Sequence, residues 1–217
     1  MDTIKVIITG ATGMVGEGVL FECLENDAVA EVLLVSRRHY PLQHPKVKEL
    51  LVPDFFRLDN VAAQLKGYDA CFFCAGISSV GMKEDKYTHI TYDTTLAFAK
   101  AVLAQNNDMR FCYVSGSHTD STEKGRLMWA RVKGKTENDL MKLPFKAVYN
   151  FRPGAMLPFP GQKNWKAVYK FIVQIMKAIV PKNVLSMQQV GRAMINACRN
   201  GYPKQILEIP DIRQLGQ

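Results

Sequence analysis

The stretch Ile4-Lys5-Val6-Ile7-Ile8-Thr9-Gly10-Ala11-Thr12-Gly13-Met14-Val15-Gly16 joins an apolar, strand-like run to an amphipathic segment that ends near Leu24. Its three glycines allow a tight turn, let the backbone approach a phosphate without an intervening Cβ, and let the following helix pack close to the strand. The helix N-terminus adds free amides and partial positive charge. A glycine triplet alone is weak evidence, but here it stands between a strand and a helix, and a second strand follows. The sequence therefore predicts a diphosphate-binding loop formed by Thr9, Gly10, Thr12, Gly13, Met14, Val15 and Gly16.

The end of the second predicted strand, Val32-Leu33-Leu34-Val35, indicates which dinucleotide this loop would hold. Enzymes that use NAD usually carry Asp or Glu there for the ribose 2′-hydroxyl, whereas a 2′-phosphate requires positive charge. This chain has Ser36-Arg37-Arg38, and two guanidiniums beside a hydroxyl can form charge-assisted hydrogen bonds to a phosphate. A solvated basic turn is the alternative interpretation. Together with the glycines, these residues predict NADP(H) rather than NAD(H).

Length and composition bound the architecture and the compartment. With 217 residues, 47% of them hydrophobic and 22% charged, the chain is expected to form one domain over 1–217, with a small appendage at 155–200 on the substrate side. Asp2 and Lys5 flank a first apolar run that is too short for a signal peptide. No uninterrupted apolar span of about twenty residues predicts a membrane helix. We therefore expect a cytoplasmic protein.

The cysteines and the charged residues exclude several other kinds of site. Five cysteines, at 23, 71, 74, 112 and 198, lie mostly in apolar segments, which suits a reducing compartment. Cys71 and Cys74 fall in a predicted strand, where residues three apart face opposite sides, so no disulfide is expected. No His or Cys cluster has metal-ligand spacing, so no metal is predicted. The net charge of +8 is scattered without a basic tract, so nucleic acid is not a predicted partner.

Short apolar runs alternate with longer helical patterns along the whole chain. This alternation predicts an α/β fold with a doubly wound parallel sheet, in which ligands bind at the carboxyl edge. The predicted strands are 4–8, 31–35, 47–52, 69–74, 110–114, 146–151 and 205–209, and the predicted helices are 14–25, 59–66, 86–105, 126–142, 164–179 and 187–200. A segment rich in Pro and Gly, 152–161, separates the nucleotide-binding core from the appendage.

The residues at the ends of these strands resemble those of the short-chain dehydrogenase/reductase superfamily, in its atypical and extended forms. Besides the glycine spacing, the resemblance rests on Val52-Pro53-Asp54-Phe55, Phe73-Cys74-Ala75-Gly76, Val114-Ser115-Gly116-Ser117 and Arg152-Pro153-Gly154. Among its members the chain is most similar to Tat-interacting-protein-like, NmrA-like NAD(P)H-binding oxidoreductases, over nearly its whole length. The resemblance implies a Rossmann-like fold and an adenine contact at Asp54 and Phe55. It further implies cofactor contacts at Cys74, Ala75, Gly76, Ser115, Arg152, Pro153 and Gly154.

One catalytic position departs from the superfamily pattern. Where the superfamily places a Tyr and, four residues later, a Lys on one helical face, this sequence reads Trp129-Ala130-Arg131-Val132-Lys133. An indole N–H donates a hydrogen bond but does not titrate usefully, so general acid catalysis by this position is lost. The resemblance still implies that Lys133 holds the ribose and that Ser117 polarises a carbonyl. His118 is expected to face solvent, and Thr94-Thr95 stands where extended members carry an Asn.

These observations are compatible with both an enzyme and a regulatory protein. The first hypothesis is an NADP-dependent oxidoreductase that moves hydride to or from a small carbonyl or alcohol, with Ser117, Trp129 and Lys133 at its centre. The second is a regulator that senses NADPH against NADP⁺ and signals through a protein partner; Trp129 favours it. A nucleotide-sugar epimerase or dehydratase fits the motifs but not the length.

The segment 165–177 is broadly apolar and carries Lys166, Lys170, Gln174 and Lys177. It could cover a substrate pocket, form a homodimer contact or lie on a membrane, or simply pack on the sheet. Substrate contacts are expected from it and from 156–159.

Overall fold

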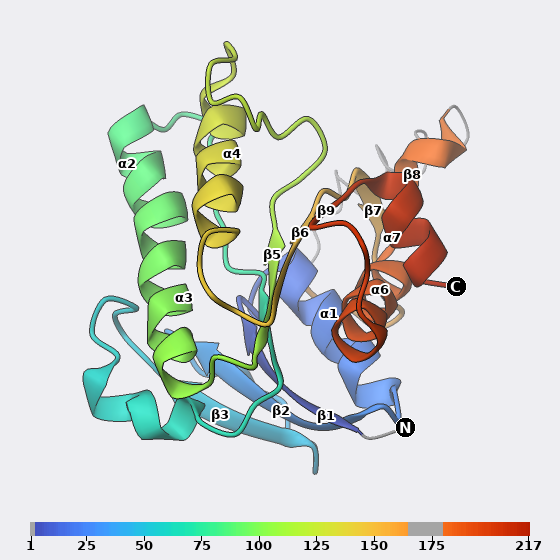
Figure 1. The fold of residues 1–217 in the computed structure, drawn as a ribbon. Helices are drawn as coiled ribbons and strands as arrows, with labels where there is room; N and C mark the ends of the chain where they lie inside the picture. Colours follow the sequence, from blue (N-terminus) through green and yellow to red (C-terminus); the bar gives the residue numbers. More distant parts are fainter. Residues whose placement is uncertain (1–2, 165–179) are drawn as a thin grey trace.

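Seven parallel strands form the central sheet in a computed structural model that describes residues 3–164 and 180–217 (Figure 1). In spatial order they are β3 (Val47–Leu51), β2 (Val29–Ser36), β1 (Ile4–Thr9), β4 (Ala70–Phe73), β5 (Arg110–Val114), β6 (Ala147–Phe151) and β9 (Ile206–Leu207). All neighbouring pairs run parallel. The predicted α/β fold with a doubly wound, Rossmann-like sheet is confirmed.

Helices cover both faces of this sheet (Figure 1). One face carries α1 (Met14–Glu25), α6 (Met187–Asn200) and α7 (Ile209–Leu215). The other carries the 3₁₀-helix η1 (Asp59–Leu65), the continuous run α2 (Glu84–Thr88), η2 (His89–Asp93) and α3 (Thr94–Gln105), and then α4 (Met128–Leu140). Two short strands, β7 (Ala155–Leu157) and β8 (Val184–Ser186), pair in parallel outside the main sheet, and the 3₁₀-helix η3 (Pro181–Asn183) precedes β8.

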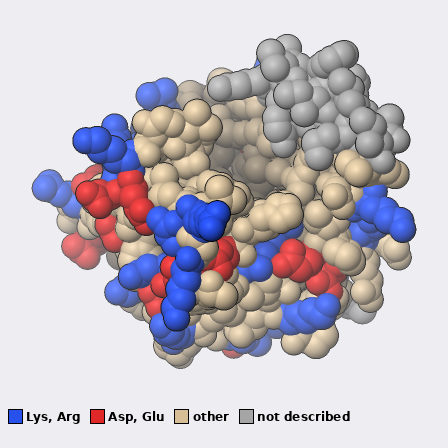
Figure 2. All heavy atoms as spheres, turned by 90° about the horizontal axis from the view of Figure 1, so that it is seen from above, with Lys and Arg blue, Asp and Glu red and all other residues tan. Residues whose placement is uncertain are grey.

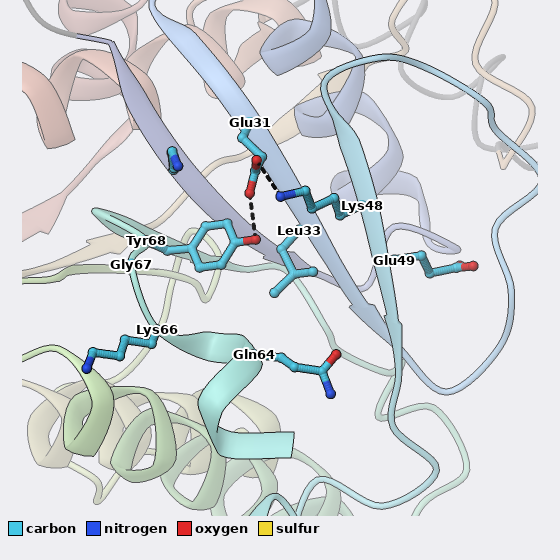
Figure 3. Close-up of a pocket in the computed structure, with 9 residues that line it drawn as sticks. Glu31, Leu33, Lys48, Glu49, Gln64, Lys66, Gly67 and Tyr68 are labelled. Atoms are coloured by element: carbon cyan, nitrogen blue, oxygen red, sulfur yellow. Dashed lines mark hydrogen bonds and ion pairs between the residues drawn. The ribbon is translucent and has the colours of Figure 1, made fainter. Parts of the chain in front are cut away.

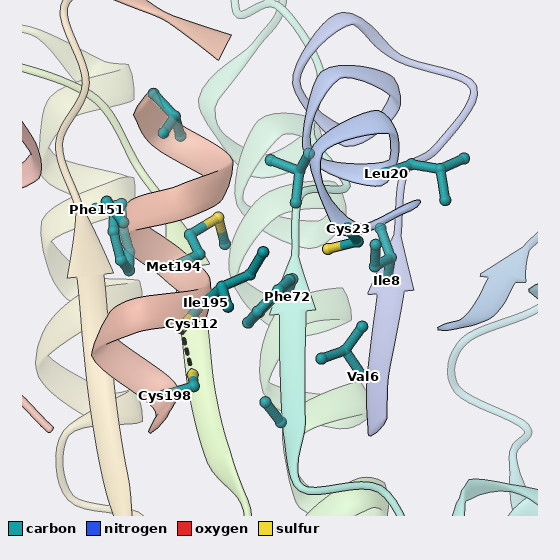
Figure 4. Close-up of a cluster of buried hydrophobic side chains, with 14 of the residues drawn as sticks. Val6, Ile8, Leu20, Cys23, Phe72, Cys112, Phe151, Met194, Ile195 and Cys198 are labelled. Atoms are coloured by element: carbon teal, nitrogen blue, oxygen red, sulfur yellow. Dashed lines mark hydrogen bonds between the residues drawn. The ribbon is translucent and has the colours of Figure 1, made fainter. Parts of the chain in front are cut away.

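The core has two layers because successive side chains of a strand point to opposite faces. Ile8 and Phe72 pack against α1 and α6 (Figure 4). Cys71 belongs to the cluster on the other face, together with residues of α3. Cys74, three residues after Cys71, contacts the α1 side, so the expected opposite placement of these two thiols is confirmed. All five cysteines are free.

The predicted strands and helices differ from the observed ones in a few places. The segment 59–66 is a 3₁₀-helix, and 86–105 contains the π-helical turn η2, where the Thr94 hydroxyl donates to the His89 carbonyl and the Thr95 hydroxyl to Thr91. The strand predicted at 205–209 has two residues, because α7 begins at Ile209 with Pro210 in its first turn. The sequence reading missed β7, β8 and α7. The predicted helix 164–179 and its lysine stripe lie outside the described residues.

Candidate functional site

The glycine loop lies at the point where the order of the sheet reverses. β1 stands between β2 and β4, so the loop after β1 and the loop after β4 leave the same edge in opposite directions. Gly10 has φ +73°, and a Cβ there would lie 2.7 Å from the backbone nitrogen of Ala75. That nitrogen also donates to the Thr9 hydroxyl at 3.2 Å. The predicted diphosphate loop and the predicted wall at Cys74, Ala75 and Gly76 are therefore in direct contact.

The N-terminus of α1 starts at a glycine that has no side chain to cap it. Gly13 is the N-cap residue, and within the described part of the chain no side-chain cap hydrogen bond is present at this helix start. A Cβ at Gly16 would overlap the Gly10 carbonyl oxygen, so only glycine allows α1 to start this close to β1. Thr12 and Gly13 are exposed, whereas Gly16 is buried. By contrast, Ser186 caps α6 with a hydrogen bond to the Gln189 amide and a full capping box.

The loop after β2 presents two cations to solvent. Arg37 and Arg38 are exposed, and among the described residues neither guanidinium forms an ion pair or a side-chain hydrogen bond. Ser36 is buried, and its hydroxyl donates to the Arg38 carbonyl at 2.6 Å, so it shapes the loop. The two arginines remain available to an anionic ligand.

The predicted adenine contacts fall into two different environments. Asp54 is exposed, and its carboxylate accepts from the Phe56 amide at 2.9 Å. The ring of Phe55 instead lies in the core, 5.1 Å from the ring of Phe98, and the predicted cofactor contact at this position stays a prediction. Its neighbour Phe56 is the exposed ring, stacked on the imidazole of His89 at 5.0 Å.

The three predicted catalytic positions follow β5 or lie on α4. Ser117 is half-buried, and its amide donates to the Pro153 carbonyl at 2.9 Å, which joins the ends of β5 and β6. Trp129 and Lys133 are half-buried one turn apart on α4. The Lys133 ammonium donates to the Ser115 carbonyl oxygen. His118 is exposed at φ 65°, as expected.

Ser115 and Arg152, two predicted cofactor contacts, direct their side chains into the protein instead. The Ser115 hydroxyl donates to Glu137 Oε1 at 2.5 Å. The Arg152 guanidinium donates to both Glu137 oxygens at 2.5 and 3.1 Å, to Glu208 at 3.1 Å and to the Ser121 hydroxyl at 2.6 Å. The hydroxyl proton and the guanidinium donors are therefore already used inside the protein, and the predicted cofactor contacts at Ser115 and Arg152 stay predictions. The backbone of Pro153 and Gly154 follows Arg152; a Cβ at Gly154 would lie 2.5 Å from the Asn183 carbonyl oxygen.

Sequence reasoning missed three carboxylates that hold these loops, two of which are buried. Glu137 lies four residues after Lys133 on α4 and is fully buried. Glu17, in the first turn of α1, is also buried and binds Tyr40, and Glu49 of β3 accepts from the Tyr40 amide at 2.7 Å. A carboxylate on an apolar helical face was the available signal for Glu17. Glu49 is an exposed residue of β3, and no signal in the local pattern marks it as a partner of the Tyr40 loop.

Burial gives Lys133 a pH dependence near neutrality. Desolvation lowers the pKa of Lys133 from its usual 10.5 to about 8, and Glu137 opposes this shift. The lysine is therefore an ammonium at pH 7 and loses its charge as the pH rises through 8. If it holds the ribose of an anionic coenzyme, affinity for NADPH should fall about threefold to tenfold between pH 7 and pH 9. Calorimetric titration at both values measures this change. In Lys133→Arg the NADPH affinity should be the same at pH 7 and pH 9, because arginine stays charged at both. If the wild-type affinity is also the same at both pH values, Lys133 does not hold the ribose through its charge.

A cavity lies at the other end of the sheet, away from the glycine loop. It measures about 630 Å³ and is lined by residues from the starts of β1, β2 and β3 and from the turn before β4 (Figure 3). Glu31 in it accepts from both Lys48 and Tyr68 at 2.8 Å, so its carboxylate is already satisfied. At the opposite end, the view from above shows a hollow lined by uncharged side chains (Figure 2). The conserved geometry of parallel sheets places ligand chemistry at that carboxyl end.

Between residues 3–164 and 180–217, no group of three His, Cys, Asp or Glu side chains is placed to bind a metal ion. None of the described helices has the length and apolarity needed to cross a membrane.

Comparison with known proteins adds a family and a fold. The profile described as "NAD dependent epimerase/dehydratase family" matches residues 6–125, more than half of the chain. "Protein HTATIP2" of Rattus norvegicus is 27% identical over 203 residues, which cover 90% of this chain and 81% of that protein. "Protein FMP52, mitochondrial" of Eremothecium gossypii is 28% identical over 156 residues, 70% of this chain and 66% of that protein. The name of this second relative places it in mitochondria, so the cytoplasmic location stays a prediction.

A solved structure confirms the fold over almost the whole chain. The Bordetella bronchiseptica enzyme WbmF in complex with NAD⁺ superposes with a TM-score of 0.69 at 16% identity. The match covers 99% of this chain and 77% of WbmF. At this level of identity the likeness establishes the Rossmann-like architecture alone.

Proposed function

Because the chain belongs to the NAD-dependent epimerase/dehydratase family, we propose that it is an NADP(H)-binding, oxidoreductase-like protein that moves hydride between the coenzyme and a small carbonyl or alcohol. One observation carries this proposal: Gly10 is pressed against Ala75 at the switch point of the sheet, beside the uncapped start of α1. The family name and the NAD⁺ bound to WbmF support a dinucleotide ligand.

The residues at this edge fit such a ligand in both shape and charge. The amides at the start of α1 would hold the diphosphate, Arg37 and Arg38 the 2′-phosphate, and Asp54 the adenine amino group. Lys133 would hold the ribose next to the nicotinamide, and the backbone at 74–76 and 153–154 would line the ring. When bound, the coenzyme supplies or accepts the hydride.

The chain's own residues would orient the substrate beside it. The Ser117 hydroxyl would donate to the carbonyl oxygen, on which negative charge develops as hydride reaches the carbon. Trp129 would wall the pocket and donate a hydrogen bond, but it cannot deliver the proton that completes an alcohol. That proton would then come from water at this half-exposed site. We therefore expect slow turnover compared with enzymes that carry Tyr at this position.

Trp129 also favours a second function, a sensor of NADPH against NADP⁺ that binds without turnover and acts through a protein partner. Both functions use the same coenzyme site and differ only in chemistry. A nucleotide-sugar epimerase or dehydratase remains a weaker alternative. Family members of that kind usually carry a larger C-terminal sugar domain.

Coenzyme selectivity tests the proposed 2′-phosphate site. Each of Arg37→Ala and Arg38→Ala should weaken NADPH binding about tenfold to a hundredfold, because each removes charge-assisted hydrogen bonds to a phosphate. NADH has no 2′-phosphate, so its affinity should stay within about threefold of the wild type. Calorimetry with both coenzymes measures the two affinities. Arg199→Ala, in the last turn of α6, is the matched control. Equal wild-type affinity for NADPH and NADH would refute the NADP(H) preference.

A further inference from the structure

A single buried carboxylate joins two segments that are far apart in the sequence. Glu17 is 1% exposed in the first turn of α1. Its Oε1 accepts from the Tyr40 hydroxyl at 2.8 Å and from Asn164 Nδ2 at 2.9 Å. Its Oε2 accepts from the backbone amides of Asn164 at 2.7 Å and Lys163 at 3.1 Å. Among the described residues no basic side chain pairs with it, so these four donors and the α1 N-terminus are what compensate its burial.

The first segment held by Glu17 is the loop that carries the two arginines. Tyr40 closes this loop two residues after Arg38, and it is buried. Desolvation, followed by the adjacent Glu17 carboxylate, raises the pKa of Tyr40, so its hydroxyl remains a donor. Glu49 holds the same loop from the other side, through the Tyr40 amide at 2.7 Å and His39 Nδ1 at 2.5 Å. The position of Arg37 and Arg38 therefore depends on the Tyr40 anchor.

The second segment is 159–164, which follows β7 on the substrate side. Besides the contacts of its last two residues with Glu17, Gln162 Nε2 donates to the Met14 carbonyl at 2.5 Å. The ring of Phe159 packs edge-on against Phe21 of α1 at 5.6 Å. The segment thus lies across the first turns of α1, next to the glycine loop.

From these contacts we infer that Glu17 is a positioning residue that couples the 2′-phosphate loop to segment 159–164. This inference rests on the proposed function, because the ligand that would engage the loop is NADP(H). A phosphate bound by Arg37 and Arg38 fixes the loop and keeps the Tyr40 hydroxyl on Oε1. The carboxylate is then held in the rotamer that accepts from the Asn164 amide. By linkage, the two segments stabilise each other's order.

The peptide bond between Lys163 and Asn164 reports on this coupling directly. Its N–H is the donor to Glu17 Oε2, and trypsin cleaves on the carboxyl side of lysine. We expect saturating NADP⁺ to slow cleavage of this bond in the wild type at least about fivefold, and saturating NAD⁺ to slow it less. Cleavage is followed by mass spectrometry of the new N-terminus at Asn164. The exposed Lys204–Gln205 bond serves as the internal reference for protease activity.

Three variants separate coupling from a general loss of stability. Tyr40→Phe should still bind NADP⁺ but lose the protection at Lys163, and it should raise cleavage without coenzyme. Glu17→Gln has a single acceptor oxygen, so cleavage should be fast with and without NADP⁺. Tyr68→Phe removes another tyrosine hydroxyl that donates to a glutamate, Glu31 at 2.8 Å, and should behave as the wild type.

The outcomes distinguish a failed coupling from a failed function. If NADP⁺ binds the wild type and the cleavage rate at Lys163 does not change, or if Tyr40→Phe is protected equally well, the coupling is wrong while the proposed function stands. If no coenzyme binds, the proposed function fails. Cleavage at Lys163 without coenzyme still tests the connection from Tyr40 through Glu17 to segment 159–164. If Tyr40→Phe is cleaved there at the wild-type rate, that connection is wrong.

Discussion

Trp129→Tyr is expected to raise the rate of NADPH-dependent carbonyl reduction about 10² to 10⁴-fold, the usual contribution of a general acid. The substitution puts a phenol one helical turn before Lys133, on the same face of α4. A phenol can donate its proton to the developing alkoxide, which an indole cannot do. The Lys133 ammonium, charged at pH 7, would lower the phenol pKa and favour that transfer.

The measurement is the loss of nicotinamide absorbance with a panel of small aldehydes and ketones, at saturating NADPH. Trp129→Phe is the matched control, because it keeps an aromatic ring and lacks the hydroxyl. Turnover in the wild type excludes a pure sensor, and turnover only in Trp129→Tyr supports the sensor. If both proteins bind NADPH and neither reduces any carbonyl, the proposed hydride transfer is wrong.

The fold could be predicted from the sequence because its signals are local and repeated. Seven apolar runs alternate with helical patterns, and short right-handed crossovers leave one arrangement, the doubly wound sheet that the structure has. The secondary-structure predictions fail where tertiary contacts determine the local conformation. The strands β7 and β8 have three residues each and pair across 26 intervening positions in the sequence, so neither carries a periodic signal of its own. The π-helical turn depends on threonine hydroxyls that bond to carbonyls of the preceding turn.

The candidate site could be predicted from the sequence only at residues whose function depends on backbone conformation. Gly10 is needed for its φ of +73° and its close approach to Ala75, and a glycine in that spacing is readable in the sequence. Side-chain roles at Ser115 and Arg152 were not readable. Resemblance placed both residues at strand ends near a cofactor, but their direction depends on Glu137, which comes from a different element. Glu137 acts through partners that are distant in the sequence, so the local pattern does not show what it binds.

Glu137→Ala is expected to lower the free energy of unfolding by about 3 to 5 kcal/mol, because it leaves a buried arginine without its main partner. Glu137 is fully buried and the Arg152 side chain is 10% exposed. Arg152 would keep the Glu208 and Ser121 contacts, which points to the lower end of that range. Urea denaturation without coenzyme measures the loss, since a bound ligand would add stability of its own.

Glu84→Ala is the control for a simple loss of charge. Glu84 pairs with Arg131 at 2.8 Å, but that carboxylate is half-exposed, and its removal should cost about 0 to 1 kcal/mol. Similar losses in the two variants would contradict the special position of the Glu137 pair.

A double variant separates the stability of this pair from its role in alignment. Replacing both members with apolar residues, as in Glu137→Met with Arg152→Met, removes the uncompensated charge and should recover most of the stability lost in Glu137→Ala. The same change removes the carboxylate that accepts from the Ser115 hydroxyl. The backbone carbonyl oxygen of the same residue accepts from Lys133. NADPH affinity should therefore stay below that of the wild type even where stability returns. If stability and affinity recover together, the ion pair serves the fold alone, and the position of Lys133 is set by the packing of α4 against β5.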